Sequence, residues 1–137
     1  MEKAATLTGR ILLGHIFLLA GISKIGGYEA TAGWMAAMGV PGGLLPLVIA
    51  LEVGGGLALI LGFQARLAAL GLAGFSIVSA VIFHADFSDQ MQSILFMKNF
   101  AMAGGLLYVV AFGAGAWSID AKIKQSRSDI PSRTTAA

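Results

Sequence analysis

The 137-residue sequence contains no cysteine, and only 12% of its residues are charged. The absence of cysteine excludes disulfides, thiolate metal sites and dithiol redox relays. Charged residues make up about a quarter of an average soluble protein. The low share here, beside 57% hydrophobic residues, excludes an ordinary soluble domain. A mean hydropathy of +0.83 indicates a protein whose solvent is the lipid bilayer.

The chain also lacks the basic surface of a nucleic-acid-binding protein. Its net charge is only +2, and its basic residues are expected at helix ends and in the tail, not in a stripe with exposed aromatic residues. Histidine is scarce as well, with only His15 and His84. On membrane-spanning helices these two would lie about 14 Å apart along the membrane normal. A histidine pair that could hold haem is therefore missing, and we expect neither haem nor a metal.

Four apolar segments predict four membrane-spanning helices, at about residues 7–25, 44–63, 67–85 and 94–114. The expected fold is an all-α integral membrane four-helix bundle over residues 1–120. The first segment could be mistaken for a secretory signal, but it carries Lys24 and three similar segments follow it, so we interpret it as a retained span. Tyr28 and Trp34 favour the membrane interface, and we expect a short interfacial helix around Trp34. Residues 121–137 form a polar tail that is expected to be disordered.

Lysine and arginine predict the orientation of the bundle. Seven of the nine basic residues fall on one side of the membrane if the four spans alternate in direction. These seven are Lys3, Arg10, Arg66, Lys122, Lys124, Arg127 and Arg133. The opposite loops contain Glu29, Asp86 and Asp89 and no arginine. Both termini are therefore predicted to be cytoplasmic, in a multi-pass protein of the bacterial inner membrane.

One carboxylate, Glu52, lies in the middle of an apolar span, in the run LEVGGGLALILG. A charge at that depth costs about 2.5–3.5 kcal/mol on insertion scales unless it is neutral or paired, so Glu52 must face the interior of the bundle. Helical spacing places Gly55 and Gly56 on the same face as Glu52. A glycine surface of this kind lets a neighbouring helix or a ligand approach the backbone closely.

Polar side chains also lie at the predicted outer ends of the other spans. Lys24 ends the first span, His84 ends the third, and Lys98 and Asn99 begin the fourth. One interpretation is structural: Lys24 and His84 lie in the membrane interface, the glycines serve packing, and Glu52 pairs with Lys24 or Lys98 as a latch between helices. The other is a polar site among the helices that opens outward. The sequence leaves both open.

The motifs that carry a family resemblance are Arg10 with Gly14 and Gly21-x-x-Lys24, Glu52-x-Gly54-Gly55 with Gly62 and Arg66, His84, and Phe96-x-Lys98-Asn99-x-x-x-x-Gly104-Gly105-Leu106-Leu107. Their order across the spans resembles the DoxX family of small four-helix bacterial membrane proteins, over about residues 9–120. That family takes its name from subunits of a terminal quinol oxidase and of a thiosulfate:quinone oxidoreductase. The resemblance therefore implies an association with membrane redox chemistry.

These observations together favour a non-haem subunit or accessory protein of a quinone-linked membrane oxidoreductase. Glu52 and His84 are the candidate catalytic residues, with Glu52 as a proton acceptor beside a quinone headgroup. The candidate ligand-binding residues are Lys24, Lys98, Asn99, Gly55 and Gly56. We expect the bilayer, other redox subunits or a second copy of the chain as partners, and no nucleic acid. The alternatives are a membrane protein that binds or transports a small solute or lipid, and a structural assembly subunit; whether the protein is an enzyme stays open.

Overall fold

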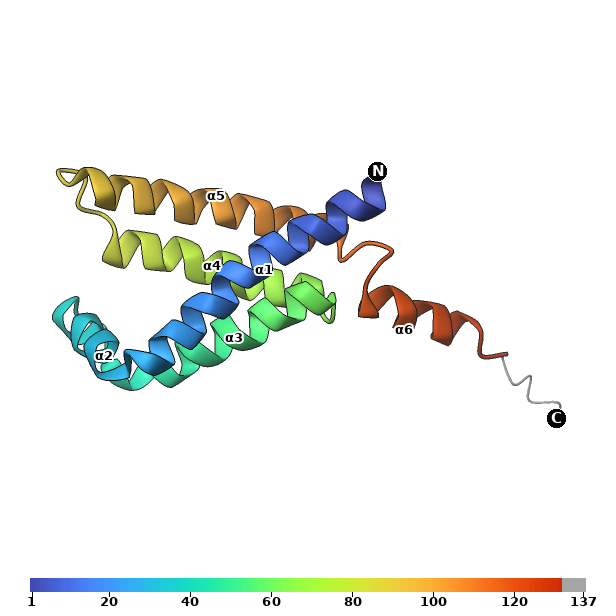
Figure 1. Ribbon diagram of the computed structural model, residues 1–137, viewed down its shortest axis with the longest axis horizontal. Coiled ribbons are helices and arrows are strands. Elements are labelled where there is room, and N and C mark those ends of the chain that lie inside the picture. Colours follow the sequence, from blue (N-terminus) through green and yellow to red (C-terminus); the bar gives the residue numbers. More distant parts are fainter. Residues whose placement is uncertain (132–137) are drawn as a thin grey trace, which may run out of the picture.

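The structure is a computed structural model that describes residues 1–131, and among these residues it contains helices joined by loops and no strand (Figure 1). The helices are α1 (Glu2–Gly26), α2 (Tyr28–Ala37), α3 (Leu45–Leu61), α4 (Ala65–Phe83), α5 (Gln90–Phe112) and α6 (Ile119–Ser128), with a 3-10 turn η1 (Gly42–Leu44) before α3. Among these residues, four helices are long and apolar enough to cross a membrane: α1, α3 together with η1, α4 and α5. The predicted all-α membrane bundle is confirmed.

The bundle consists of two helix pairs (Figure 1). Helix α1 packs along α3, and α4 packs along α5, while contacts between α3 and α4 join the pairs. Because successive spans alternate in direction, the N-terminus and α6 lie at one end, and α2 lies at the other. We call these the terminal end and the α2 end. The short helix expected around Trp34 is α2.

Helices α1 and α3 approach each other closely at facing glycines. A Cβ atom added to Gly14 would lie 2.7 Å from the backbone oxygen of Gly56, and one added to Gly56 would lie 2.7 Å from that of Gly14. About two turns along α1 toward the α2 end, a Cβ atom on Gly21 would lie 3.1 Å from Cβ of Glu52. Helices in lipid associate through such close packing, because burial away from lipid adds little. The contact also brings the next turn of α1, which carries Lys24, to the carboxylate of Glu52.

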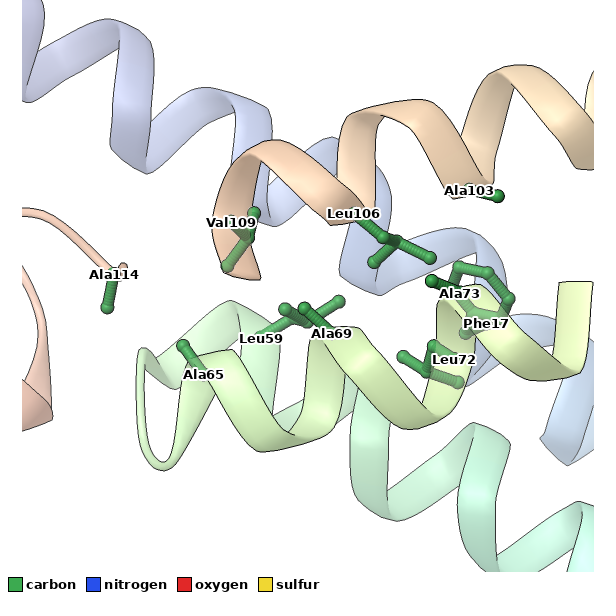
Figure 2. Close-up of a cluster of buried hydrophobic side chains, with 10 residues drawn as sticks. All are labelled: Phe17, Leu59, Ala65, Ala69, Leu72, Ala73, Ala103, Leu106, Val109 and Ala114. Carbon is green, nitrogen blue, oxygen red and sulfur yellow. The ribbon is translucent and has the colours of Figure 1, made fainter. Parts of the chain in front are cut away.

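The apolar core lies between the two pairs in the terminal half of the bundle (Figure 2). Leu59 of α3, Leu72 of α4 and Leu106 of α5 are fully buried, and Phe17 enters from α1. Alanines on the inner face of α4 allow the neighbouring helices to come near; they are Ala65, Ala69 and Ala73. Side chains therefore fill the space between the two helix pairs in this half of the bundle.

A buried arginine fastens the terminal end. Arg10 is 1% exposed, and its guanidinium donates hydrogen bonds to the backbone oxygens of Leu59 at 2.7 Å and Ile60 at 3.2 Å, in the last turn of α3. It also donates to the backbone oxygen of Trp117, in the segment before α6. The last carbonyl groups of a helix have no hydrogen-bond donor within that helix, so Arg10 supplies the donors that these carbonyl groups of α3 lack. One side chain thus joins α1, α3 and the C-terminal segment.

Helix α6 overlaps the tail, residues 121–137, for which the sequence predicted disorder, and over residues 121–128 the structure differs from that expectation. Ser118 caps the helix by accepting a hydrogen bond from a backbone amide of its first turn at 3.1 Å. The carboxylate of Asp120 accepts from the backbone amides of Gln64 at 2.8 Å and Ala65 at 3.0 Å, at the start of α4. These local contacts order a segment whose composition is polar. Residues 132–137, including Arg133, lie outside the described residues.

Candidate functional site

A cavity of about 300 Å³ lies at the α2 end, lined by side chains from both helix pairs and from α2. Its polar lining residues are Lys24, Thr31, Glu52, Ser79, His84 and Asn99. Its apolar and aromatic lining residues are Ile16, Phe17, Ala20, Trp34, Met35, Val48, Phe75, Phe83 and Met102. A mostly apolar cavity with a few convergent polar groups is typical of a small-molecule site, and this volume stands at the small end of such sites.

An ion pair between α1 and α3 forms one wall of the cavity. The Nζ atom of Lys24 lies 2.8 Å from Oε2 and 3.0 Å from Oε1 of Glu52. The side chain of Glu52 is 4% exposed and that of Lys24 is 26% exposed, so the carboxylate is the deeper partner. The charge that the sequence places inside the span is therefore paired. Of the two partners the sequence left open for Glu52, the structure places Lys24 in contact.

A second polar group lies where α4 ends. His84 follows the last residue of α4, and its Nδ1 atom lies 2.8 Å from Oε1 of Gln92, in the first turn of α5. Trp34 of α2 covers this corner, with its ring centroid 4.8 Å from that of Phe83 and 6.2 Å from that of His84. Helix α2 thus places an aromatic ring over the mouth of the cavity.

The loop between α4 and α5 holds His84 and Gln92 side by side through its own hydrogen bonds. Asp86 accepts hydrogen bonds from the hydroxyl and the backbone amide of Ser88, which together lower the pKa of Asp86 below its ordinary value. Asp89 caps α5 by accepting from the backbone amide of Met91 at 2.9 Å. The turn is therefore built locally by acidic side chains. That local order sets the distance between the end of α4 and the start of α5.

The structure does not gather all the predicted site residues around the cavity. Lys24, Glu52, His84 and Asn99 line it. Lys98 is exposed on α5 and lies outside the lining, because it is one residue, about 100° around the helix, from Asn99. Gly55 faces the side chain of Leu72, and Gly56 faces the backbone of α1, so both glycines lie at helix contacts. His15 is exposed as well and does not line the cavity.

Three lining or neighbouring residues were missed by the sequence analysis. Thr31 and Ser79 are short polar residues, and nothing in their spacing along the sequence indicates that they face a site. Gln92 lies eight residues after His84, across a loop, and only the turn geometry reveals that the two side chains meet. The acidic turn residues between them were the available signal, because they predict a tight connection.

Comparison with known proteins shows relatives over most of the chain. The DoxX family model matches residues 5–85. The chain is 48% identical over 120 residues to the Inner membrane protein YqjF of Escherichia coli (strain K12), which covers 88% of this chain and 92% of that protein. It is 33% identical over 121 residues to the Inner membrane protein YphA of the same organism, with coverage of 83% and 86%.

A third relative is more distant. The chain is 30% identical over 80 residues to the protein of Bacillus subtilis (strain 168) named Putative oxidoreductase CatD, covering 58% of this chain and 59% of that protein. No solved structure matches the chain. Together with the four candidate spans, the relatives confirm the predicted location in the bacterial inner membrane.

Proposed function

This chain belongs to the DoxX family of membrane proteins, and from that premise we propose that it is a non-haem subunit or accessory protein of a quinone-linked membrane oxidoreductase. In this proposal the cavity at the α2 end opens toward the outside of the cell and binds the ring of a membrane quinone. A distant relative carries the name of an oxidoreductase, which supports redox chemistry without specifying a substrate.

The cavity is the observation that carries the proposal. Its volume of about 300 Å³ suits one substituted ring and excludes a long isoprenoid tail. Two of its lining residues, Ile16 and Trp34, are also 44% and 46% exposed on the surface of the bundle. A ring could therefore enter from the lipid while its tail remained among the acyl chains.

The polar residues in the wall suit an uncharged ring with two oxygens. Because Lys24 and Glu52 neutralise each other at 2.8 Å, a neutral ligand can enter without meeting an unpaired charge. A quinone supplies the redox chemistry when it is bound. Histidine is the side chain best suited to proton exchange near neutral pH, so His84 is the candidate that passes protons to or from the ring, with the carboxylate of Glu52 as the second acceptor.

A second candidate function is the binding of a small acidic or lipidic solute. The observation that favours it is the partial exposure of Lys24, whose ammonium group donates one hydrogen bond to Glu52 and has further N–H groups available. One of these N–H groups could bind a carboxylate or phosphate oxygen. No redox change would accompany such binding.

Mass spectrometry of the small molecules that co-purify with gently extracted protein tests the proposal. The variant Ala20→Phe fills the cavity, and Ala101→Phe adds the same bulk to an exposed position of α5 outside the lining. We expect a quinone enriched over bulk lipid in the wild type and in Ala101→Phe, and lost from Ala20→Phe. Equal quinone in all three proteins would contradict the proposal. An organic acid that follows the same pattern would instead support the second function.

A further inference from the structure

A recess lies at the terminal end, at the opposite end of the bundle from the cavity, and we call it the terminal recess. Its volume is about 590 Å³, and its walls come from the start of α4, the end of α5 with the following loop, and α6. The charged lining residues are Arg66, Asp120 and Lys124, and the large apolar ones are Leu67 and Phe112. Arg66 is the second residue of α4 and Phe112 the last of α5, whereas α6 projects beyond the ends of these spans (Figure 1). The terminal recess therefore lies at the level of the lipid headgroups.

Two of the three charges in the terminal recess are cations, and the one carboxylate is already bound by the protein. Both oxygens of Asp120 accept hydrogen bonds from backbone amides at the start of α4, at 2.8 Å and 3.0 Å. A helix N-terminus carries a partial positive charge, which offsets part of the charge of that carboxylate. Among residues 1–131, neither Arg66 nor Lys124 forms an ion pair. The terminal recess is therefore positively charged and suited to an anion.

Gly113 allows the guanidinium of Arg66 to pack against the loop after α5. Its φ angle is +80°, and a Cβ atom added there would lie 3.2 Å from Nε and 3.3 Å from Nη2 of Arg66. The backbone conformation and the close approach both favour glycine at this position. The guanidinium is thus held at the wall of the terminal recess. A planar guanidinium in a fixed place matches the geometry of a phosphate group, which it can bind through two parallel hydrogen bonds.

Large apolar side chains border the same recess. Leu67 is 67% exposed and Phe112 is 76% exposed, and at the ends of spans such side chains contact acyl chains. A phosphate site beside acyl chains has the chemistry of a phospholipid. The terminal end is also the side predicted to be cytoplasmic, and the cytoplasmic leaflet is the one whose surface is made negative by anionic lipids.

We propose that the terminal recess binds an anionic phospholipid, with Arg66 and Lys124 on the phosphodiester and the acyl chains along Leu67 and Phe112. A zwitterionic lipid carries the same phosphodiester, but its ammonium group is repelled by the two cations. Because Lys124 belongs to α6 and Arg66 to α4, the bound headgroup joins α6 to the bundle. This site is separate from the cavity at the α2 end and does not depend on the function proposed for that cavity.

Native mass spectrometry of the purified full chain in detergent, titrated with lipids, tests the proposal. The probes are dioleoyl phosphatidylglycerol, dioleoyl phosphatidylcholine and glycerophosphoglycerol, which is the first headgroup without acyl chains. We expect phosphatidylglycerol to bind at least about tenfold more tightly than either of the others, a difference of about 1.4 kcal/mol. Equal binding of phosphatidylcholine, or binding of no probe, would overturn the proposal. Equally tight binding of glycerophosphoglycerol would identify a soluble phosphate ester as the ligand and exclude the lipid.

Charge-matched variants test whether the site is the terminal recess. Arg66→Gln with Lys124→Gln should weaken the binding of phosphatidylglycerol about tenfold, to the level of phosphatidylcholine. Lys3→Gln with Lys122→Gln removes the same charge from exposed positions of the terminal end outside the lining, and should bind as the wild type does. Lys122 lies about 160° around α6 from Lys124, so it faces away from the terminal recess. An equal loss in both double variants would show attraction by overall charge only and would overturn the site.

A conservative variant keeps the test valid if the loss of two charges disturbs folding. Arg66→Lys retains the charge and removes the planar fork, so it should weaken phosphatidylglycerol about threefold and leave phosphatidylcholine unchanged. Circular dichroism and thermal melting establish that each variant is folded. A folded Arg66→Lys variant with the affinity of the wild type would exclude the guanidinium as the phosphate-binding group.

Discussion

The two members of the ion pair between Lys24 and Glu52 are unequally buried, so we expect their single replacements to destabilise the protein by different amounts. Replacing Lys24 by Met leaves a carboxylate that is only 4% exposed without its partner. Loss of one partner of a buried pair costs about 3–5 kcal/mol, since the remaining charge stays desolvated. Lys24→Met should therefore be severely destabilising.

Removing the other partner of the pair, Glu52, should cost less stability. Glu52→Gln leaves Lys24 without an anion, but the side chain of Lys24 is 26% exposed and can extend toward the interface. We expect a loss of about 1–2 kcal/mol, close to that of a lost hydrogen bond to a charged group. In the double variant, Lys24→Met with Glu52→Gln, no charge is buried. Its loss of stability should therefore be no larger than that of Glu52→Gln alone.

Unfolding by sodium dodecyl sulfate in mixed micelles, followed by circular dichroism, measures these differences. Lys98→Met is the matched control, because Lys98 is exposed on α5 and outside the cavity, and it should change stability by no more than about 0.5 kcal/mol. Because the double variant should cost no more than Glu52→Gln alone, the double-variant cycle should give a coupling free energy of about 3–5 kcal/mol. Additive effects of the two substitutions, or an equal loss in Lys98→Met, would refute the reasoning.

Three further predictions concern packing, topology and the loop at the α2 end. Gly14→Leu should disrupt the contact of α1 with α3 and lower the melting temperature in detergent, whereas Gly54→Ala should change it little, because an added Cβ atom there meets no described residue within 4 Å. Single cysteines introduced in place of Asp89 and Asp129 should react with a membrane-impermeant maleimide from the outside and the inside respectively, since the chain has no other cysteine; reversed labelling would overturn the orientation. The lowered pKa of Asp86 means that its hydrogen bonds stabilise the turn at pH values above the ordinary carboxylate pKa, and that this contribution is lost as the pH falls through the lowered value. Hydrogen exchange of the turn should accelerate over that acidic range in the wild type and lose this pH dependence in Asp86→Asn.

The architecture could be predicted because membrane-spanning helices are constrained by length and by backbone hydrogen bonding, both of which a sequence displays directly. Glu52 could be assigned to the interior for a similar reason, since the cost of a charge in lipid leaves no other place for it. The sequence could not show which lysine pairs with Glu52, because Lys24 and Lys98 lie at similar depths on different helices. That choice depends on which helices pair, and the contacts of Gly14 and Gly21 with α3 decide it.

Other features depend on geometry that spacing does not encode. The hydrogen bond between His84 and Gln92 crosses a loop whose exact turn was not predictable. Helix α6 is polar, and its order comes from a cap at Ser118 and from contacts of Asp120 with the start of α4, so its composition alone indicated disorder. The functional roles of the site residues remain predictions.

The most direct test of the central claim, that a ring binds in the cavity at the α2 end, uses the fluorescence of Trp34. Trp34 lines the cavity and Trp117 lies at the terminal end, and the sequence contains no further tryptophan, so Trp117→Phe makes Trp34 the single reporter. Titration of this variant in detergent with tetramethyl-1,4-benzoquinone should quench the emission saturably, and Ala20→Phe in the same background should abolish the saturable part. The reciprocal variant Trp34→Phe, which reports from Trp117, should show only weak quenching that is linear in quinone concentration. Linear quenching of Trp34, or saturable quenching that survives in Ala20→Phe, would contradict the account.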